Sequence, residues 1–252
     1  MTQRPRAVMT GAARRVGAAI ALELARAGFD LLLHHRASDP SATVAACREA
    51  GAEVTTVQAD LATVQGCDDV TRAVHLRWDS LHLLVNNASV FEPCGFEDVS
   101  ADVLDRMMAL HARAPLLLSR GLLGLLRAAD ARALGAPAAQ AGLVVHLCDI
   151  GAERPIRGYT AYSMSKAALV MLVRAMAVEL APAVRTVGVS PGQVSWPDDY
   201  DDERRVRLMR RIPLARVGGP DDIARLVRFL ATEGHYLNGV VIPVDGGLST
   251  RY

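Results

Sequence analysis

The sequence lacks any cluster of cysteine and histidine with the spacing of a zinc site or a disulfide framework. Its four cysteines, Cys47, Cys67, Cys94 and Cys148, are scattered along 252 residues without a CxxC pair. Scattered cysteines of this kind are typical of reduced, buried thiols in a cytosolic protein. We therefore expect no metal site and a cytoplasmic location.

The sequence also lacks a dominant charge and a long hydrophobic run. Its 28 lysine and arginine residues nearly cancel 27 aspartate and glutamate residues, so no net field is available to attract nucleic acid or an anionic membrane. No apolar run reaches the roughly 18 residues that span a bilayer, and no charged-then-apolar leader is seen. These features weigh against nucleic-acid and membrane partners and favour a small-molecule ligand.

What the sequence has is a hydrophobic content of 51%, which is enough for a large core in one domain. Short apolar runs alternate with longer segments of helical period. Strands are expected near 6–9, 29–35, 52–60, 81–87, 142–148, 184–190 and 239–244, and helices near 16–28, 41–50, 66–77, 101–128, 161–181 and 221–232. This order predicts a single Rossmann-type α/β domain over residues 1–252, a doubly wound parallel sheet of about seven strands with helices on both faces.

The segment TGAARRVG, residues 10–17, lies between the first expected strand and the first helix. Backbone N–H groups and the helix dipole can hold a pyrophosphate at such a turn, although a purely structural turn is the alternative. Arg15 stands where a glycine is usual, so its guanidinium is expected to reach phosphate and ligand, or else to lie in solvent. The expected cofactor contacts here are Gly11, Arg14, Arg15, Val16 and Gly17.

The second expected strand ends in HHR and has no acidic residue at its carboxyl end. An acidic side chain there would bond the ribose 2′-hydroxyl and repel a 2′-phosphate. His34, His35 and Arg36 offer cationic and donor groups instead, which predicts NADP(H) rather than NAD(H); a basic loop facing solvent is the alternative. Asp60, next to Leu61, is expected either to accept from the adenine amino group or to cap a helix.

Tyr162 and Lys166 stand at positions i and i+4 of a strongly helical segment, so they share one face. A phenol is a poor acid or base at neutral pH, and a nearby ammonium is expected to lower its pKa. Lys166 is also expected to hold the nicotinamide ribose. An ordinary helix face is the alternative. Tyr159 lies two turns from Lys166, which is too far for direct pairing.

In order and spacing, these segments resemble the short-chain dehydrogenase/reductase family over essentially the whole chain. The matching segments are TGAARRVG, NNAS at 86–89, YSMSK at 162–166, SPG at 190–192 and VDGG at 244–247. The resemblance implies hydride transfer with a nicotinamide cofactor, Tyr162 as proton donor with Lys166 as its partner, and a tetramer or dimer, of which we expect a homotetramer. The further cofactor-lining residues expected on this basis are Asn87, Ala88, Ser89, Pro191, Gly192 and Val194.

Two positions depart from the common family pattern. Asp149 stands where most members carry a serine thirteen residues before the tyrosine, and His111 stands where many carry an asparagine. Pteridine reductases and dihydromonapterin reductases of the family are similar to this chain in having the aspartate, the paired basic residues of the first turn and an Asn-Ala-Ser-x-Phe segment. His111 is expected either to relay protons or to bond a backbone carbonyl.

A pterin is a flat heterocycle with a polar edge, which suggests a reason for these residues. Phe91 is expected to stack on the ring, and Ser89 and Arg15 to bond its polar edge. Asp149 beside Tyr162 would form a coupled acid pair that delivers the proton to a ring nitrogen or holds the amino group. The alternatives are a turn-capping role for Asp149 and a loop-anchoring role for Phe91.

The sequence therefore predicts an NADPH-dependent reductase of dihydropteridines with Asp149, Tyr162 and Lys166 as catalytic residues. A general carbonyl reductase, acting on 3-oxoacyl or other ketones, and a non-catalytic NADP(H)-binding regulatory protein are the alternatives. The charged segment 193–211, which contains Trp196, is expected to be a loop that closes over substrate, or else a plain surface loop. By resemblance, Arg251 or Tyr252 is expected to reach a neighbouring subunit's site.

Overall fold

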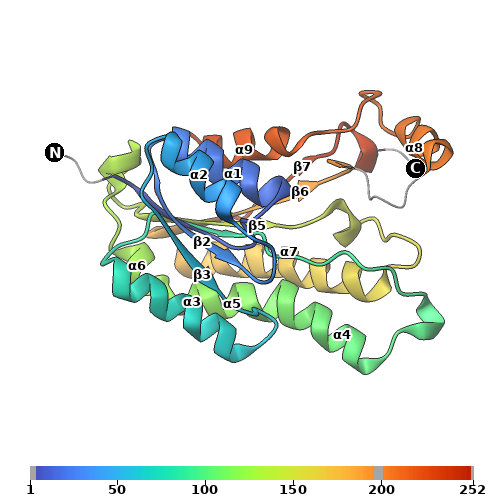
Figure 1. Ribbon diagram of the computed structural model, residues 1–252, viewed down its shortest axis with the longest axis horizontal. Helices are drawn as coiled ribbons and strands as arrows, with labels where there is room; N and C mark the ends of the chain where they lie inside the picture. The colour runs from blue at the N-terminus through green and yellow to red at the C-terminus, as the bar shows by residue number, and fades with distance from the viewer. Residues whose placement is uncertain (1–3, 196–200, 251–252) are drawn as a thin grey trace.

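A single parallel sheet forms the centre of the computed structural model, which describes residues 4–195 and 201–250 (Figure 1). Seven strands lie in the order β3-β2-β1-β4-β5-β6-β7, and every pair is parallel. Their bounds are β1 Arg6–Met9, β2 Asp30–His35, β3 Val54–Gln58, β4 Leu83–Asn86, β5 Gly142–Leu147, β6 Val184–Pro191 and β7 Val241–Val244. The predicted doubly wound fold is confirmed.

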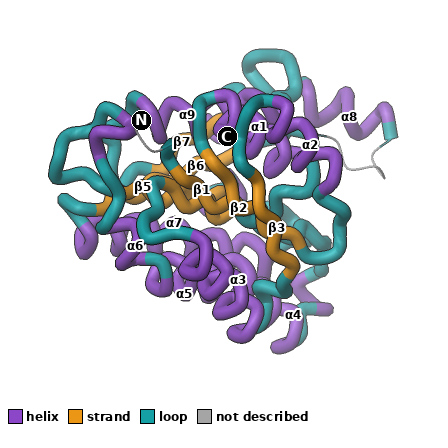
Figure 2. The backbone as a smooth tube through the Cα atoms, turned by 60° about the vertical axis from the view of Figure 1, so that its left-hand side comes forward, coloured by secondary structure: helices purple, strands orange, loops and turns teal. Residues whose placement is uncertain are grey.

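Helices cover both faces of the sheet, as Figures 1 and 2 show. One layer consists of α1 Arg15–Arg26, α2 Ser41–Glu49 and α9 Pro220–Thr232. The other contains α3 Val64–Arg77, α4 Ala101–Met108, α5 Ala114–Gly121, α6 Leu123–Arg127 and α7 Thr160–Leu180. The short helix α8, Asp202–Met209, lies beyond the end of the sheet.

Strand β2 shows why the central strands have continuous apolar sequences. Leu31 and Leu33 belong to the core cluster under α1 and α9, whereas Leu32 belongs to the cluster under α3 and α5. A strand buried on both faces needs apolar residues at every position, unlike the alternating pattern of a half-exposed sheet. Three of the four free cysteines, Cys47, Cys67 and Cys148, are buried as expected.

Two segments differ from the sequence prediction. The helix expected over 101–128 is divided by a π-helical stretch, Ala109–Arg113, and again after Gly121, where an added Cβ would lie 2.9 Å from the Thr71 side chain. The segment expected to be irregular near 193–211 contains helix α8. Its residues are mostly charged, so α8 gives almost no apolar periodicity to detect.

Helix α7 is the one helix in the described part of the chain that is long and apolar enough to cross a membrane by length and composition alone. Of its most apolar window, 56% is buried inside the molecule. That burial is what a core helix of a three-layer α/β/α fold requires, because its apolar face packs on the sheet. The helix carries both Tyr162 and Lys166 on its buried face.

Arg185 joins the start of β6 to the end of α9 from a buried position. Its guanidinium donates to the carbonyl oxygens of Leu230 at 3.0 Å, Gly234 at 2.9 Å and Leu237 at 3.0 Å. Burial lowers the pKa of Arg185, because the charged form loses water. The last carbonyls of a helix have no partner within the helix, so the bond to Leu230 satisfies one of them, and the bonds to Gly234 and Leu237 hold the turn that follows α9.

Replacing Arg185 with methionine should lower the free energy of unfolding by about 2–4 kcal/mol, because buried carbonyls lose their donors. Urea denaturation followed by circular dichroism measures the change. Arg225→Met is the matched control, since Arg225 forms an exposed ion pair with Asp222 that contributes about 0–1 kcal/mol. Equal destabilisation by the two substitutions would contradict this role of Arg185.

Candidate active site

The turn after β1 is built around glycines that allow close backbone contact. Gly11 has φ +65°, and a Cβ at Gly17 would lie 2.0 Å from the Gly11 carbonyl oxygen. Helix α1 begins at Arg15 without a capping bond from the described Arg14 side chain. The first N–H groups of a helix point outward and favour an anion, so this turn has the features that a pyrophosphate requires.

The turn after β4 is bonded directly to the turn after β1. The Thr10 hydroxyl accepts from the N–H groups of Asn87 at 2.8 Å and Ala88 at 3.0 Å. The Asn87 amide donates to the carbonyl oxygens of Thr10 at 2.9 Å and Gly11 at 3.0 Å. The predicted cofactor residues of the two turns are therefore brought together as one hydrogen-bonded unit.

The end of β2 requires a correction. His34 is 2% exposed, and its ring nitrogens contact the Gly11 N–H at 3.2 Å and the Ala59 carbonyl oxygen at 3.0 Å. Because both nitrogens are engaged, His34 is not placed to bind a 2′-phosphate as predicted. His35 is partly exposed and Arg36 is exposed, so these two side chains keep the expected access.

The turn after β3 places Asp60 at the surface. One Asp60 carboxylate oxygen accepts from the Ala62 N–H at 2.9 Å, while Thr63 caps helix α3 by accepting from the Gly66 N–H. The helix-capping alternative for Asp60 is therefore wrong. Leu61 is buried in the core, so its side chain faces away from the surface.

The segment after β6 lies at the same carboxyl ends of the strands as the turns described above. Pro191 ends β6, and the Gly192 N–H donates to the Val244 carbonyl oxygen at 3.1 Å. A Cβ at Gly192 would lie 2.6 Å from the Asp245 Cβ, so the close approach requires glycine. Val194 is half-buried against the core beneath α1 and α9.

Tyr162 and Asp149 form the centre of the candidate active site. The Tyr162 hydroxyl donates to Asp149 Oδ2 at 2.7 Å, and Asp149 Oδ1 accepts from the Gly151 N–H at 2.6 Å. Asp149 follows β5, whereas Tyr162 lies in the first turns of α7. The carboxylate thus caps the turn after its strand and also contacts the phenol, which combines both roles considered from the sequence.

Lys166 lies beneath this pair. Its ammonium is 5.7 Å from the centre of the Tyr162 ring and donates to the Leu147 carbonyl oxygen at 2.8 Å. Burial lowers the pKa of Lys166, and the Asp149 charge opposes that shift. Burial, followed by the Asp149 charge, raises the pKa of Tyr162 well above its usual value. The expectation that Lys166 lowers this pKa is therefore wrong for the chain alone, and the phenol keeps its proton at neutral pH.

The rings of Phe91 and Tyr159 lie beside the phenol. Phe91 is 43% exposed and stacks on Tyr159, with ring centres 4.2 Å apart and an angle of 12° between the planes. The Tyr162 ring meets Phe91 edge-on at 5.0 Å. Sequence reasoning considered Tyr159 only by its distance from Lys166 and missed this pairing, because Phe91 is remote along the chain.

His111 occupies the π-helical stretch and is 1% exposed. Ser165 donates to the Tyr162 carbonyl oxygen at 2.7 Å, so the His111 Nδ1–H must donate to the Ser165 oxygen at 2.8 Å. Nε2 then accepts from the Val90 N–H at 3.2 Å and lies 3.0 Å from the Ser89 hydroxyl. Burial lowers the pKa of His111 to about 2. The backbone-carbonyl alternative is therefore wrong, because His111 accepts from a backbone N–H instead, and the proton-relay role stays a prediction.

Arg15 and Ser89 are both exposed. Arg15 has φ +53° and donates to the Ser195 hydroxyl, which links the first turn to the segment after β6. Ser89 bonds His111, as described above. Trp196, Arg251 and Tyr252, predicted near the substrate or a neighbouring subunit, lie outside the described residues.

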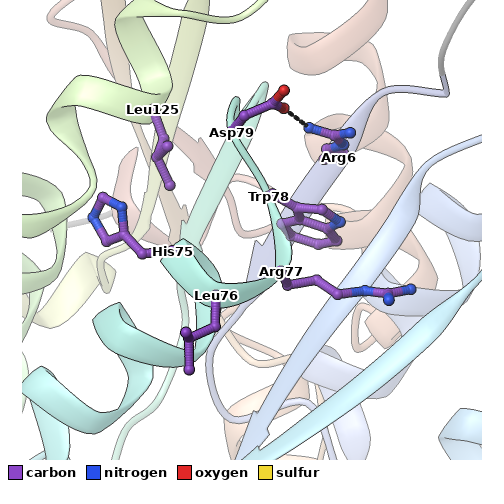
Figure 3. Close-up of a pocket in the computed structure, with 7 residues that line it drawn as sticks. All are labelled: Arg6, His75, Leu76, Arg77, Trp78, Asp79 and Leu125. Carbon is purple, nitrogen blue, oxygen red and sulfur yellow. Dashed lines mark hydrogen bonds and ion pairs between the residues drawn. The ribbon is translucent and has the colours of Figure 1, made fainter.

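A recess at the opposite end of the sheet does not share these residues (Figure 3). It is lined by Arg6, His75, Leu76, Arg77, Trp78, Asp79 and Leu125. Arg6 forms an ion pair with Asp79, as the dashed line in Figure 3 marks, and Arg77 contacts Glu53 at 2.7 Å. Because ligands of open parallel sheets bind at the carboxyl ends of the strands, we assign the site to the other end.

Comparison with known proteins agrees with this geometry. Residues 11–249 match a family model described as enoyl-(acyl carrier protein) reductase. The chain belongs to the short-chain dehydrogenase/reductase family. Members of this family use a nicotinamide cofactor, which supplies or accepts a hydride when bound. The tight turn that glycine allows at 11 and 17 and the uncapped start of α1 fit such a dinucleotide, because the first N–H groups of a helix favour its phosphates.

The relatives differ in substrate. The chain is 33% identical to pteridine reductase 1 of Leishmania tarentolae, over 97% of this chain and 96% of that one. It is 31% identical to dihydromonapterin reductase of Klebsiella pneumoniae, over 99% of both chains.

Solved structures of similar fold include reductases that are named for different substrates. FolM alternative dihydrofolate reductase 1 from Brucella canis, complexed with NADP, has a TM-score of 0.85 at 29% identity, covering 98% of this chain and 95% of that one. A 3-oxoacyl-[acyl-carrier protein] reductase from Brucella melitensis has a TM-score of 0.86 at 28% identity, covering 100% of both.

The raised pKa of Tyr162 sets an expected pH dependence. A proton donor acts below its pKa, so reduction should persist through neutral pH and fall only as the pH rises above that raised value. Asp149→Asn removes a charge that raises this pKa, so the alkaline limb of kcat/KM should move to lower pH. Steady-state rates against pH measure both profiles, with Asp68→Asn on the exposed face of α3 as the control. An unmoved alkaline limb would show that Asp149 does not act on the phenol.

His111→Leu should lower kcat/KM roughly tenfold, because the Val90 N–H and the Ser165 hydroxyl lose a partner. The shape of the pH profile should not change between pH 5 and 9, since His111 stays neutral there, with a pKa of about 2. Rates across that range for both proteins make the comparison. Loss of an ionisation in His111→Leu would instead indicate a proton relay.

Proposed function

We propose that the protein is an NADPH-dependent reductase of dihydropteridines, which transfers a hydride to a ring C=N bond of a dihydromonapterin, dihydrobiopterin or dihydrofolate type of substrate. The observation that carries the proposal is the 2.7 Å hydrogen bond from the Tyr162 hydroxyl to Asp149 beside the exposed ring of Phe91. The relatives that reduce pterins, by their names, support it.

The chemistry of a C=N bond requires two additions. The cofactor, when bound, would supply the hydride to carbon and would itself be oxidised, and nitrogen would take one proton, so the double bond would become CH–NH. Tyr162 keeps a proton at neutral pH and can donate it, while Asp149 can accept from an amino group. A simple ketone needs only the donor, so the carboxylate adds a contact that a nitrogenous ring uses.

Recognition of a flat ring rests on the residues around the pair. Phe91 offers an aromatic face supported from one side by Tyr159, and such faces bind flat heterocycles by offset stacking. Arg15 and Ser89 are exposed donors on the same edge of the sheet. On this proposal, Arg15 releases Ser195 and Ser89 releases His111, and both then form hydrogen bonds to the polar edge of the substrate.

The preference for NADPH over NADH rests on the end of β2. Arg36 is exposed there, His35 is partly exposed, and the strand itself ends without an acidic residue. The FolM structure is a complex with NADP, which supports the same choice. We further propose a cytoplasmic homotetramer whose partner is a small pterin molecule.

A general carbonyl reductase is the second candidate. It is favoured by the full-length structural match to a 3-oxoacyl reductase and by Tyr162 and Lys166, which suffice for ketone reduction. A non-catalytic NADP(H)-binding protein has less support, because the buried phenol and ammonium are both placed at the carboxyl edge of the sheet.

Oxidation of NADPH should be observed with dihydropterins and not with simple ketones, at a higher kcat/KM than with NADH. Asp149→Ser should lower kcat/KM for a dihydropterin roughly 100-fold, on the order of one acid–base contribution, and affect any ketone activity much less. Cofactor absorbance across a substrate panel measures these rates, with Asp68→Ser as the control. Turnover of ketones without turnover of any pterin would favour the second candidate.

A further inference from the structure

His34 lies at the point where the ends of three adjacent strands meet. Its own backbone ends β2 next to His35, its ring contacts Gly11 after β1, and its other ring nitrogen contacts Ala59 after β3. The side chain is 2% exposed. A buried histidine with both nitrogens engaged cannot contact a ligand directly, so its effect must pass through these neighbours.

The hydrogen bonds define the charge and tautomer of the ring. The Gly11 N–H is a donor, so Nδ1 accepts and carries no proton. The Ala59 carbonyl oxygen is an acceptor, so Nε2 carries the proton and donates. His34 is therefore neutral, and burial lowers its pKa in agreement with that assignment.

The two peptide groups on either side of Gly11 are held from opposite directions. Their carbonyl oxygens, those of Thr10 and Gly11, accept from the Asn87 amide at 2.9 and 3.0 Å. Their N–H groups, those of Gly11 and Ala12, donate to His34 Nδ1 at 3.2 Å and to the His34 carbonyl oxygen at 2.9 Å. All four polar groups of this turn are thus satisfied by one residue on each side.

We propose that neutral His34 is a positioning residue for the nicotinamide cofactor. It fixes the peptide planes around Gly11 opposite Asn87, and thereby holds the turn in the conformation that receives the pyrophosphate. Asn87 belongs to the NNAS segment that carries the family resemblance, whereas His34 was predicted as a direct ligand of the 2′-phosphate. The proposal depends on membership of the reductase family and not on the identity of the substrate.

Three substitutions separate the two hydrogen bonds of the ring. His34→Asn places an amide oxygen near the position of Nδ1 and keeps an acceptor for the Gly11 N–H. His34→Gln places an amide group near the position of Nε2 and keeps only the donor to Ala59. His34→Leu removes both. His75→Asn, at the exposed end of α3, controls for the loss of a histidine.

Dissociation constants for NADPH and NADH, measured by isothermal calorimetry on the whole protein, give the test. We expect His34→Gln and His34→Leu to weaken both cofactors by the same factor, roughly 5- to 10-fold, as for the loss of one hydrogen bond. His34→Asn should remain within about threefold of the parent protein. Equal weakening of both cofactors is required because His34 does not contact the 2′-phosphate that distinguishes them.

Two results would overturn the proposal. Weakening of NADPH alone would show that His34 binds the 2′-phosphate directly. Lowered melting temperatures in all three variants with unchanged dissociation constants would show a role in stability only. A melting curve for each variant identifies any protein that has not folded, and His34→Gln, which keeps the donor to Ala59 and loses only the acceptor for the Gly11 N–H, then decides the outcome.

Discussion

In a parallel sheet, the peptide groups just beyond the carboxyl ends of the strands have no strand to pair with, and the hydrogen bonds that satisfy them determine the shape of the site. Here Thr10, His34 and Asn87 supply those bonds between the ends of neighbouring strands. The resulting edge is rigid because nearly every bond is between groups fixed by the sheet itself. Glycine at 11 and 17 then allows the backbone to approach closely where a ligand must bind.

The protonation of Tyr162 and Lys166 depends on their burial beside Asp149 at this end of the sheet. Lys166 and Tyr162 are buried, and Asp149 lies beside them at the end of β5. Burial disfavours the charged forms of Lys166 and Tyr162, whereas the Asp149 charge favours the Lys166 ion and opposes the phenolate. The Tyr162 phenol therefore keeps its proton and donates a hydrogen bond to the Asp149 carboxylate.

The sequence was sufficient to predict the strands, because a strand buried on both faces must be apolar throughout, and β1 and β6 agree closely with their predicted bounds. It also identified Asp149, since an ionisable residue directly after a buried strand lies at the edge where ligands bind. The residue types at the end of β2 predicted cationic and donor groups there, but they did not show which side chains point into the molecule and which point outward. His34 turns into the molecule, whereas Arg36 turns out.

Contacts between remote segments could not be predicted in this way. Tyr159 pairs with Phe91 because a backbone hydrogen bond from Cys94 to Gly158 brings their loops together, and no local pattern encodes that bond. The π-helical stretch around His111 adds one residue per turn without changing composition, so hydrophobic periodicity alone reads it as an ordinary helix.

Arg15 has a left-handed backbone, with φ +53°, at a position where glycine would be relaxed. An L side chain in this conformation costs on the order of 1 kcal/mol, and the exposed guanidinium recovers little of it through packing. A library selected only for heat resistance would therefore drift toward glycine at position 15. Such variants would gain thermal stability but lose a cation beside the turn that follows β1. Selection for heat resistance alone would therefore lower the affinity of the protein for its ligand.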